Sequence, residues 1–288
     1  PIKGSGDFLF FFHTVLWAFL PWSILLYAAV IKLIKERSLK HKAKQWMVVG
    51  SAAITFLIFS ISKFQLPYYI VILFPHFSFL CADYLLHIKS TRWLRFFFIL
   101  QRILLLMGWL AVIGLSLLFG LPAEGWIIVA ATLITLLFLY LFRTQSISSV
   151  IIAGIGFCLV VNLFLNLYFY PILLQYQSGD AAARWLNQNK KEEHWVGLFG
   201  KENFSFKWKA NANVIYTNKL PAVSKNGSPV LYYFTTKPKA DSLVNANASV
   251  TVLQSFPNFH VSIITLPFLN KNTRASTLDT TVIFKMVQ

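Results

Sequence analysis

The sequence predicts a membrane α-helical bundle of six transmembrane helices, followed by a small extracytoplasmic α/β domain. Of the 288 residues, 57% are hydrophobic and only 12% are charged, against roughly 25% charged residues in soluble domains. The hydrophobic residues form long runs up to position 174, and the rest of the chain alternates short apolar runs with polar clusters. We therefore expect a transmembrane region at residues 1–174 and an extracytoplasmic α/β domain at residues 175–288.

The apolar segments are each close to or above the roughly 17 to 25 residues that cross a bilayer as a helix. The six segments are Phe8–Ile34, Trp46–Ser62, Leu66–His87, Phe96–Phe119, Trp126–Phe142 and Ile147–Leu174. Pro21 and Pro75 lie inside the first and third of them, where proline is expected to kink a helix. The first segment is too long for a signal peptide and the chain begins with Pro1, so we expect a fragment of a longer protein.

The distribution of positive charge predicts the orientation in the membrane, because cytoplasmic loops are enriched in Lys and Arg. Eleven of the thirteen Lys and Arg residues before Gln175 lie at the loops after the first, third and fifth segments. The opposite side has only Lys3 and Lys63. We therefore predict a multi-pass protein of the bacterial inner (plasma) membrane, with Lys63 and the C-terminal domain outside the cytoplasm.

The sequence of the C-terminal part predicts one amphipathic helix and several short strands. "SGDAAARWLNQN" begins with good helix-capping residues, and five alternating runs follow it: "HWVGLFG", "NVIYTN", "VLYYFTT", "SVTVLQSF" and "TVIFKMV". The net charge of +16 is spread over both halves of the chain without a nucleic-acid-binding motif, so we expect no nucleic-acid partner. Cys81 and Cys158 both fall inside apolar segments, which argues against a disulfide.

The stretch "SISKFQLPYYI" contains the main candidate site residues. Lys63 interrupts two apolar runs, and Pro67 makes the nearby backbone irregular, which suits a cavity wall better than a lipid contact. Tyr68 and Tyr69 follow, and an ammonium group beside phenol hydroxyls is suitable for binding a phosphate. The alternatives are a lysine that snorkels to the interface and tyrosines of the aromatic belt.

Other ionisable residues give weaker indications. His13 could contact a polar head group or bond to another helix, and His76, next to Pro75, is better explained as a structural partner at the kink. Asp7 is better explained as a helix cap than as a general base. No P-loop, dinucleotide turn or Cys/His metal cluster is visible, so we expect no cofactor, and a divalent metal requirement stays open.

Several segments together resemble one known family. "FFFHTVLWAFLPWSILL", "SKFQLPYYIVILFPHFSFL" and the closing "SFPNFHVSIITLPFLNKNTRASTLDTTVIFKMV" are similar to the C-terminal half of GT-C type integral-membrane glycosyltransferases. The branch concerned contains the aminoarabinose lipid A transferases and bacterial relatives of the protein O-mannosyltransferases. The resemblance extends along most of the chain.

The resemblance implies a lipid-linked sugar donor. It implies transfer of a sugar from a polyprenyl-phosphate carrier to a lipid or protein acceptor on the extracytoplasmic face, usually with inversion. It also implies that Lys63, with Tyr68 or Tyr69, lies near the carrier phosphate; we add His13 as a further candidate. The expected partners are thus membrane lipids, the polyprenyl-phosphate-linked sugar and the acceptor.

The resemblance also implies what this chain lacks. The acidic catalytic residue of the family lies in a loop after the first transmembrane helix of the whole protein, so we assign no catalytic residue and expect this chain alone to be inactive. The alternative hypothesis is a non-enzymatic membrane anchor that displays a periplasmic α/β binding domain for envelope assembly. A transporter half is less favoured, because the spans contain few ionisable groups.

Overall fold

The chain forms two compact units. The computed structural model describes residues 8–35, 39–122, 124–189, 195–200, 202–220, 230, 232–245 and 250–286. By their internal contacts the units are Pro1–Ile113 with Gly125–Asn162, and Gly114–Glu124 with Leu163–Gln288. The second unit therefore combines the C-terminal sheet with the ends of two long apolar helices.

The first apolar segment is divided into two helices, α1 (Phe10–Ala18) and α2 (Ser23–Lys35), instead of one kinked helix. The break surrounds Pro21, which has no backbone N–H and cannot continue the helical ladder. The Pro21 carbonyl accepts a hydrogen bond of 2.9 Å from the buried Gln101 side chain. This bond supplies the partner that the interrupted helix cannot supply.

The next two segments form α3 (Leu39–Ile61), the 3-10 helix η1 (Pro67–Leu73) and α4 (Phe74–Leu86). The expected kink near Pro75 is a change of helix type, because the Phe74 N–H bonds to the Val71 carbonyl, three residues back, before the α-helix begins. A core of buried side chains holds α1 to α4 and η1 together, with Phe11, Ile70 and Leu73 fully buried in it.

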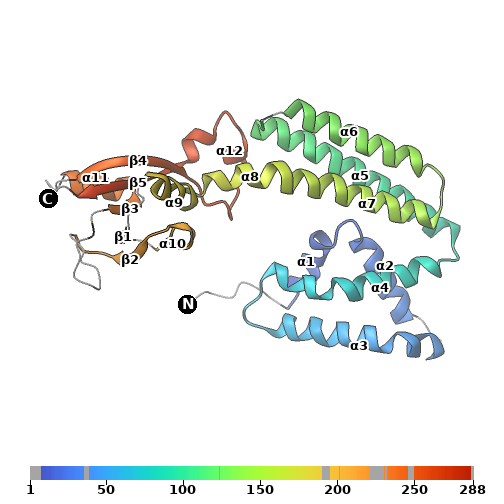
Figure 1. Cartoon of the computed structure of the whole chain (residues 1–288). Helices are drawn as coiled ribbons and strands as arrows, with labels where there is room; N and C mark the ends of the chain where they lie inside the picture. The colour runs from blue at the N-terminus through green and yellow to red at the C-terminus, as the bar shows by residue number, and fades with distance from the viewer. Residues whose placement is uncertain are drawn as a thin grey trace. The chain divides into compact units, whose positions relative to one another are not determined.

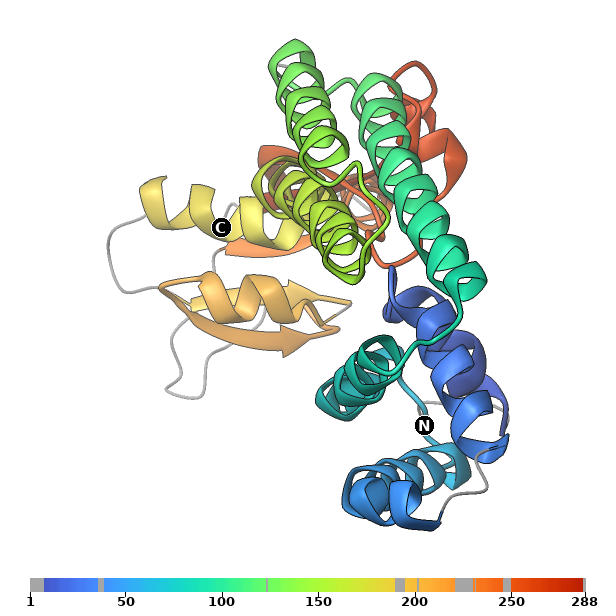
Figure 2. The same ribbon diagram turned by 90° about the vertical axis from the view of Figure 1, so that its right-hand side faces the viewer.

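Three long helices lie side by side in Figures 1 and 2: α5 (Thr91–Phe119), α6 (Glu124–Leu141) and α7 (Ile147–Phe164). Small residues let them approach, since a Cβ added at Gly108 would come within 2.9 Å of the Phe157 ring. Trp109 of α5 also donates a hydrogen bond of 2.9 Å to Thr132 of α6. Such packing of small residues is typical of helices in membranes.

Four helices within the described residues are long and apolar enough to cross a membrane. They are Pro67–Leu86, Thr91–Phe119, Glu124–Leu141 and Ile147–Tyr176, and Trp46–Ile61 is a shorter apolar helix. These helices indicate a multi-pass membrane protein. The count of six spans and the side of the membrane on which the C-terminal domain lies stay predictions.

The last apolar segment changes helix type near its end. After α7 come a π-helical turn η2 (Leu165–Phe169), α8 (Tyr170–Leu173) and the 3-10 turn η3 (Leu174–Tyr176). The amphipathic helix α9 (Ser178–Asn189) begins one residue later and has the predicted bounds. The apolar helices thus end just before α9, and the expected domain bounds of 1–174 and 175–288 stay a prediction.

The C-terminal domain contains a mixed five-stranded sheet in the order β2-β1-β3-β5-β4. Its strands are β1 (Trp195–Phe199), β2 (Asn213–Thr217), β3 (Tyr232–Thr236), β4 (Val250–Asn258) and β5 (Asp279–Met286). β1 is parallel to β2 and β3, whereas β5 is antiparallel to both β3 and β4. All five predicted strands are confirmed.

Helices cover both faces of this sheet. Ala182 and Leu186 of α9 pack with Phe206 of α10 (Phe204–Lys209) against one face. Ala240 of α11 (Lys237–Asn245) packs against the other face, beside Phe284. Side chains of β5 alternate between these two cores, as the period of two in a strand requires. The sequence analysis did not identify α10 or α11.

Arg274 joins the C-terminal segment to the ends of membrane helices within the second unit. This segment comprises α12 (Leu266–Leu269) and the 3-10 turn η4 (Arg274–Thr277). The guanidinium donates to the carbonyl oxygens of Phe119 at 2.6 Å and Phe268 at 3.0 Å, and to the Tyr176 hydroxyl at 3.1 Å. It also lies 3.8 Å from the centre of the Phe119 ring. The side chain therefore satisfies a carbonyl at the C-terminal end of α5.

Candidate functional site

The candidate site begins where α3 ends. Between Ile61 and η1 the chain makes a short irregular turn, and Lys63 lies within it with an exposed side chain. The neighbours of Lys63 bond to each other, since the Ser62 hydroxyl donates to the Phe64 carbonyl at 3.1 Å and accepts from the Phe64 N–H at 3.3 Å. These bonds define the backbone of the turn that presents Lys63.

Gln65 anchors this turn to the end of α3. Its side chain is 2% exposed, and its Nε2 donates to the carbonyls of Ser60 at 2.9 Å and Phe59 at 3.4 Å. The last carbonyls of a helix have no partner within the helix, so the side chain acts as a C-terminal cap. Its Oε1 atom is buried without a hydrogen-bonding partner among the described residues.

Sequence reasoning assigned no role to Gln65. The signal that could have identified it is the position of an amide side chain four residues after Ile61, the last apolar residue of the run, and just before Leu66 and Pro67. The turn is thus held from inside by Gln65 while Lys63 is exposed.

Tyr68 and Tyr69 begin η1 directly after Pro67. Their rings meet edge to face with centres 5.0 Å apart, and the Tyr69 ring also lies 5.8 Å from that of Phe59. Tyr68 is 64% exposed, whereas Tyr69 is partly buried. The Tyr69 ring is therefore fixed by α3, and the Tyr68 ring is free on one side.

The stretch Lys63–Tyr69 brings the three main candidates into one local segment. Among the described residues, Lys63 forms neither a hydrogen bond nor an ion pair. An exposed ammonium without a protein partner, in the same short segment as two phenol groups, can bind an anion such as a phosphate. No group of three or more His, Cys, Asp or Glu side chains that could hold a metal occurs in the described part of the chain.

His13 lies on α1, the helix that packs against η1 through the core residue Phe11. Its side chain is exposed, and no hydrogen bond within the described chain joins it to Lys63, Tyr68 or Tyr69. Its assignment to the site therefore stays a prediction.

His76 and Asp7 were each predicted to have a structural role. His76 lies in the first turn of α4, and its Nδ1 atom is buried without a hydrogen-bonding partner in the described residues. The structure thus shows no hydrogen bond from this ring nitrogen at the expected kink. Asp7, the expected helix cap, lies outside the described residues.

Comparisons with known proteins find structural likeness without sequence matches. No protein-family model matches the chain, and no curated protein matches it in sequence. Two solved structures of ArnT from Cupriavidus metallidurans match, each with a TM-score of 0.60. One is in the apo state at 19% identity, and the other is bound to undecaprenyl phosphate at 18% identity.

The likeness covers 97% of this chain but 52% of the ArnT chain. At this level of identity it shows the fold alone. The chain thus shares the fold of about half of the ArnT chain, and the resemblance seen in the sequence is confirmed at the level of the fold.

Proposed function

We propose that this chain is part of a glycosyltransferase that moves a sugar from a polyprenyl-phosphate carrier to a lipid or protein acceptor. Transfer takes place on the extracytoplasmic face of a bacterial inner membrane. The observation that carries the proposal is the exposed, unpaired Lys63 in a turn anchored by Gln65, next to Tyr68 and Tyr69. The fold likeness supports it, because one of the similar ArnT structures is bound to undecaprenyl phosphate.

In this proposal Lys63 neutralises the carrier phosphate. When the bond between the sugar and the phosphate breaks, the bonding electrons move to the phosphate oxygen, and negative charge develops on the leaving group. An ammonium group at that oxygen stabilises the transition state more than the ground state. Inversion at the anomeric carbon follows if the acceptor attacks from the side opposite the phosphate.

The tyrosines and His13 have supporting roles. The ring of Tyr69 packs against Phe59, and its hydroxyl donates a hydrogen bond to another phosphate oxygen. Tyr68 covers the outer side of the phosphate. His13 contacts the polar head of the carrier from α1. No general base is assigned in this chain, so sugar transfer is tested in the full-length protein.

The test is Lys63→Ala in the full-length protein. We expect the rate of sugar transfer from the polyprenyl-phosphate donor to fall about 100-fold, as for removal of one donor to a developing anion. Membrane insertion and abundance stay unchanged because the side chain is exposed and has no protein partner in the described structure. Transfer is measured with labelled donor in proteoliposomes.

Two variants make this test specific. Lys63→Arg keeps the charge and should retain part of the activity, whereas Lys89→Ala removes another exposed lysine outside the site and should change nothing. Wild-type turnover of Lys63→Ala would remove Lys63 from the mechanism.

A further inference from the structure

The short helix α10 carries two large exposed rings. Asn203 caps it by accepting a hydrogen bond of 2.9 Å from the Phe206 N–H, and Phe206 is fully buried with its ring stacked 4.8 Å from that of Phe234. Phe204 and Trp208 are four residues apart and are 75% and 89% exposed. Residues at this spacing are neighbours on one side of a helix. The helix thus has one buried ring and two exposed rings.

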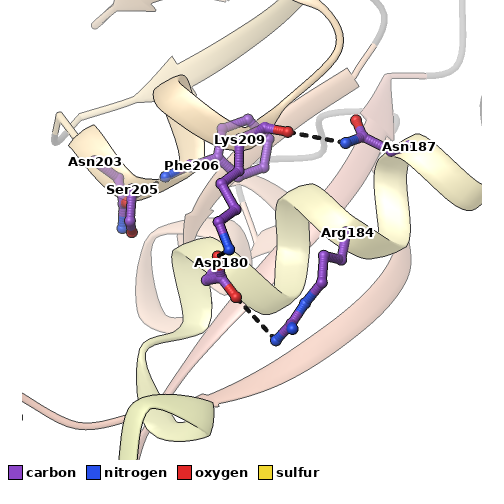
Figure 3. A network of polar contacts seen from close by, with 7 residues as sticks. All are labelled: Asp180, Arg184, Asn187, Asn203, Ser205, Phe206 and Lys209. Carbon is purple, nitrogen blue, oxygen red and sulfur yellow. Dashed lines mark hydrogen bonds and ion pairs between the residues drawn. The ribbon is translucent and has the colours of Figure 1, made fainter. Parts of the chain in front are cut away.

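Polar contacts fix α10 to α9, as Figure 3 shows. The Asn187 side chain donates a hydrogen bond of 2.9 Å to the Lys209 carbonyl, and Lys209 Nζ lies 2.6 Å from Asp180 Oδ1. Gly179 permits a close approach, because a Cβ there would overlap the side chains of Asn203 and Ser205. α10 therefore cannot turn its exposed rings inward without breaking this network.

This arrangement places α10 beside the end of a membrane helix within the same unit. Phe204 and Trp208 line a hollow of about 810 Å³ together with Leu174 and Gln177. Leu174 belongs to the apolar helix Ile147–Tyr176, which is long enough to cross a membrane. The exposed rings therefore lie near the C-terminal end of that helix.

The composition of α10 suits the boundary between lipid and water. Tryptophan is enriched at this boundary because its ring is largely apolar while its N–H can bond to water or head groups. Lys207 is exposed and adds positive charge, which attracts anionic lipid head groups within a Debye length, whereas Lys209 is paired with Asp180. In water, by contrast, the two exposed rings leave apolar surface unburied.

We propose that α10 rests in the head-group layer of the bilayer leaflet at which the helix Ile147–Tyr176 ends. Phe204 and Trp208 insert among the lipids, and Lys207 faces the phosphates of anionic phospholipids. Membrane lipid therefore fills the hollow. The contact between α10 and the lipids holds the C-terminal domain at a set height above the membrane. This inference does not depend on the proposed sugar transfer.

The test measures the depth of spin labels in the whole chain reconstituted into nanodiscs. Cys81 and Cys158 are replaced by alanine, and single labels are placed by Trp208→Cys, Phe204→Cys or Val244→Cys. Val244 is the matched control, since it is 47% exposed on α11, which covers the opposite face of the sheet from α10. Collisions with oxygen report lipid, and collisions with a water-soluble nickel chelate report water.

We expect the labels at 208 and 204 to collide more with oxygen than with the nickel chelate, and the label at 244 to show the reverse. Lys207→Glu should reduce the depth of the label at 208 in phosphatidylglycerol nanodiscs but not in phosphatidylcholine nanodiscs. A label at 208 that behaves as the one at 244 would overturn the proposal. So would a label at 208 shielded from both reagents, because a protein would then cover α10.

Discussion

Two cations at helix ends, Lys63 and Arg274, are used in opposite ways. The Arg274 guanidinium donates to several backbone carbonyls and to the Tyr176 hydroxyl, and it lies over the Phe119 ring. Lys63 forms no such contact within the described residues, although its turn is held by Gln65. The polar groups around Arg274 are thus satisfied by the protein, whereas the charge of Lys63 is available to a ligand.

Arg274 thus has a structural role, whereas Lys63 is a candidate for binding a ligand. Arginine offers five N–H donors in a fixed planar arrangement, which suits simultaneous contacts with several carbonyls, whereas lysine provides a mobile point charge. Sequence position alone does not distinguish them, since both follow an apolar segment closely. The contacts of each side chain supply the distinction, and mutations at both positions can test it.

The largest expected effect on stability is that of Arg274→Ala. The substitution leaves the carbonyls of Phe119 and Phe268 without their donor and removes the contact with an aromatic ring, so we expect a loss of about 3 kcal/mol in the free energy of unfolding. Thermal unfolding of the purified chain in detergent measures it.

Matched variants sharpen the comparison. Arg274→Lys keeps the charge without the planar array of donors and should lose about half as much. Lys63→Ala should change the free energy of unfolding by less than about 0.5 kcal/mol, as for an ordinary surface residue. Equal losses for Lys63→Ala and Arg274→Ala would show that the two cations do not differ as described.

A smaller effect is expected for Gln65→Ala. The turn loses two hydrogen bonds to the end of α3, at a cost of about 1.5 kcal/mol, and Lys63 is no longer held in position. We therefore expect a lower affinity for undecaprenyl phosphate, measured by titration in detergent, together with the lower stability.

Gln65→Met is the control for this change. It nearly keeps the volume of the side chain but cannot donate, so it should weaken carrier binding as Gln65→Ala does. Wild-type affinity in Gln65→Met would show that the turn needs only a side chain of this size there.

The smallest effect is expected from single hydroxyl deletions. Tyr69→Phe should weaken the binding of undecaprenyl phosphate about fivefold, which corresponds to about 1 kcal/mol for one lost hydrogen bond. Tyr68→Phe should have less effect, because the Tyr68 ring is 64% exposed and is not fixed by α3. A larger loss for Tyr68→Phe would assign the phosphate contact to Tyr68 instead.

The pattern of the sequence predicted the elements that depend on local periodicity. The strands and α9 follow from alternation and capping, and the apolar helices follow from hydrophobic runs. The first segment was expected as one kinked helix, but its division into α1 and α2 involves Gln101, which lies 80 residues from Pro21. Such a distant partner leaves no signal in the sequence near the proline.

The candidate site stays a prediction. Lys63 and the tyrosines were visible as polar residues between apolar runs, and the structure places them in one short segment at the end of α3 and the start of η1. Gln65 was not identified, because an amide that caps a helix and an amide that faces water look alike in sequence. The role of Arg274 also depends on a contact across 155 positions.

The order of the strands has a consequence for the timing of folding during synthesis. β1 pairs with both β2 and β3, so these three strands can form their part of the sheet before β5 has been made. β5 is the last of the five strands to be made, yet it lies between β3 and β4, and β4 has only β5 as its partner among the described strands. β4 therefore stays unpaired until β5 has been translated and has reached the same side of the membrane.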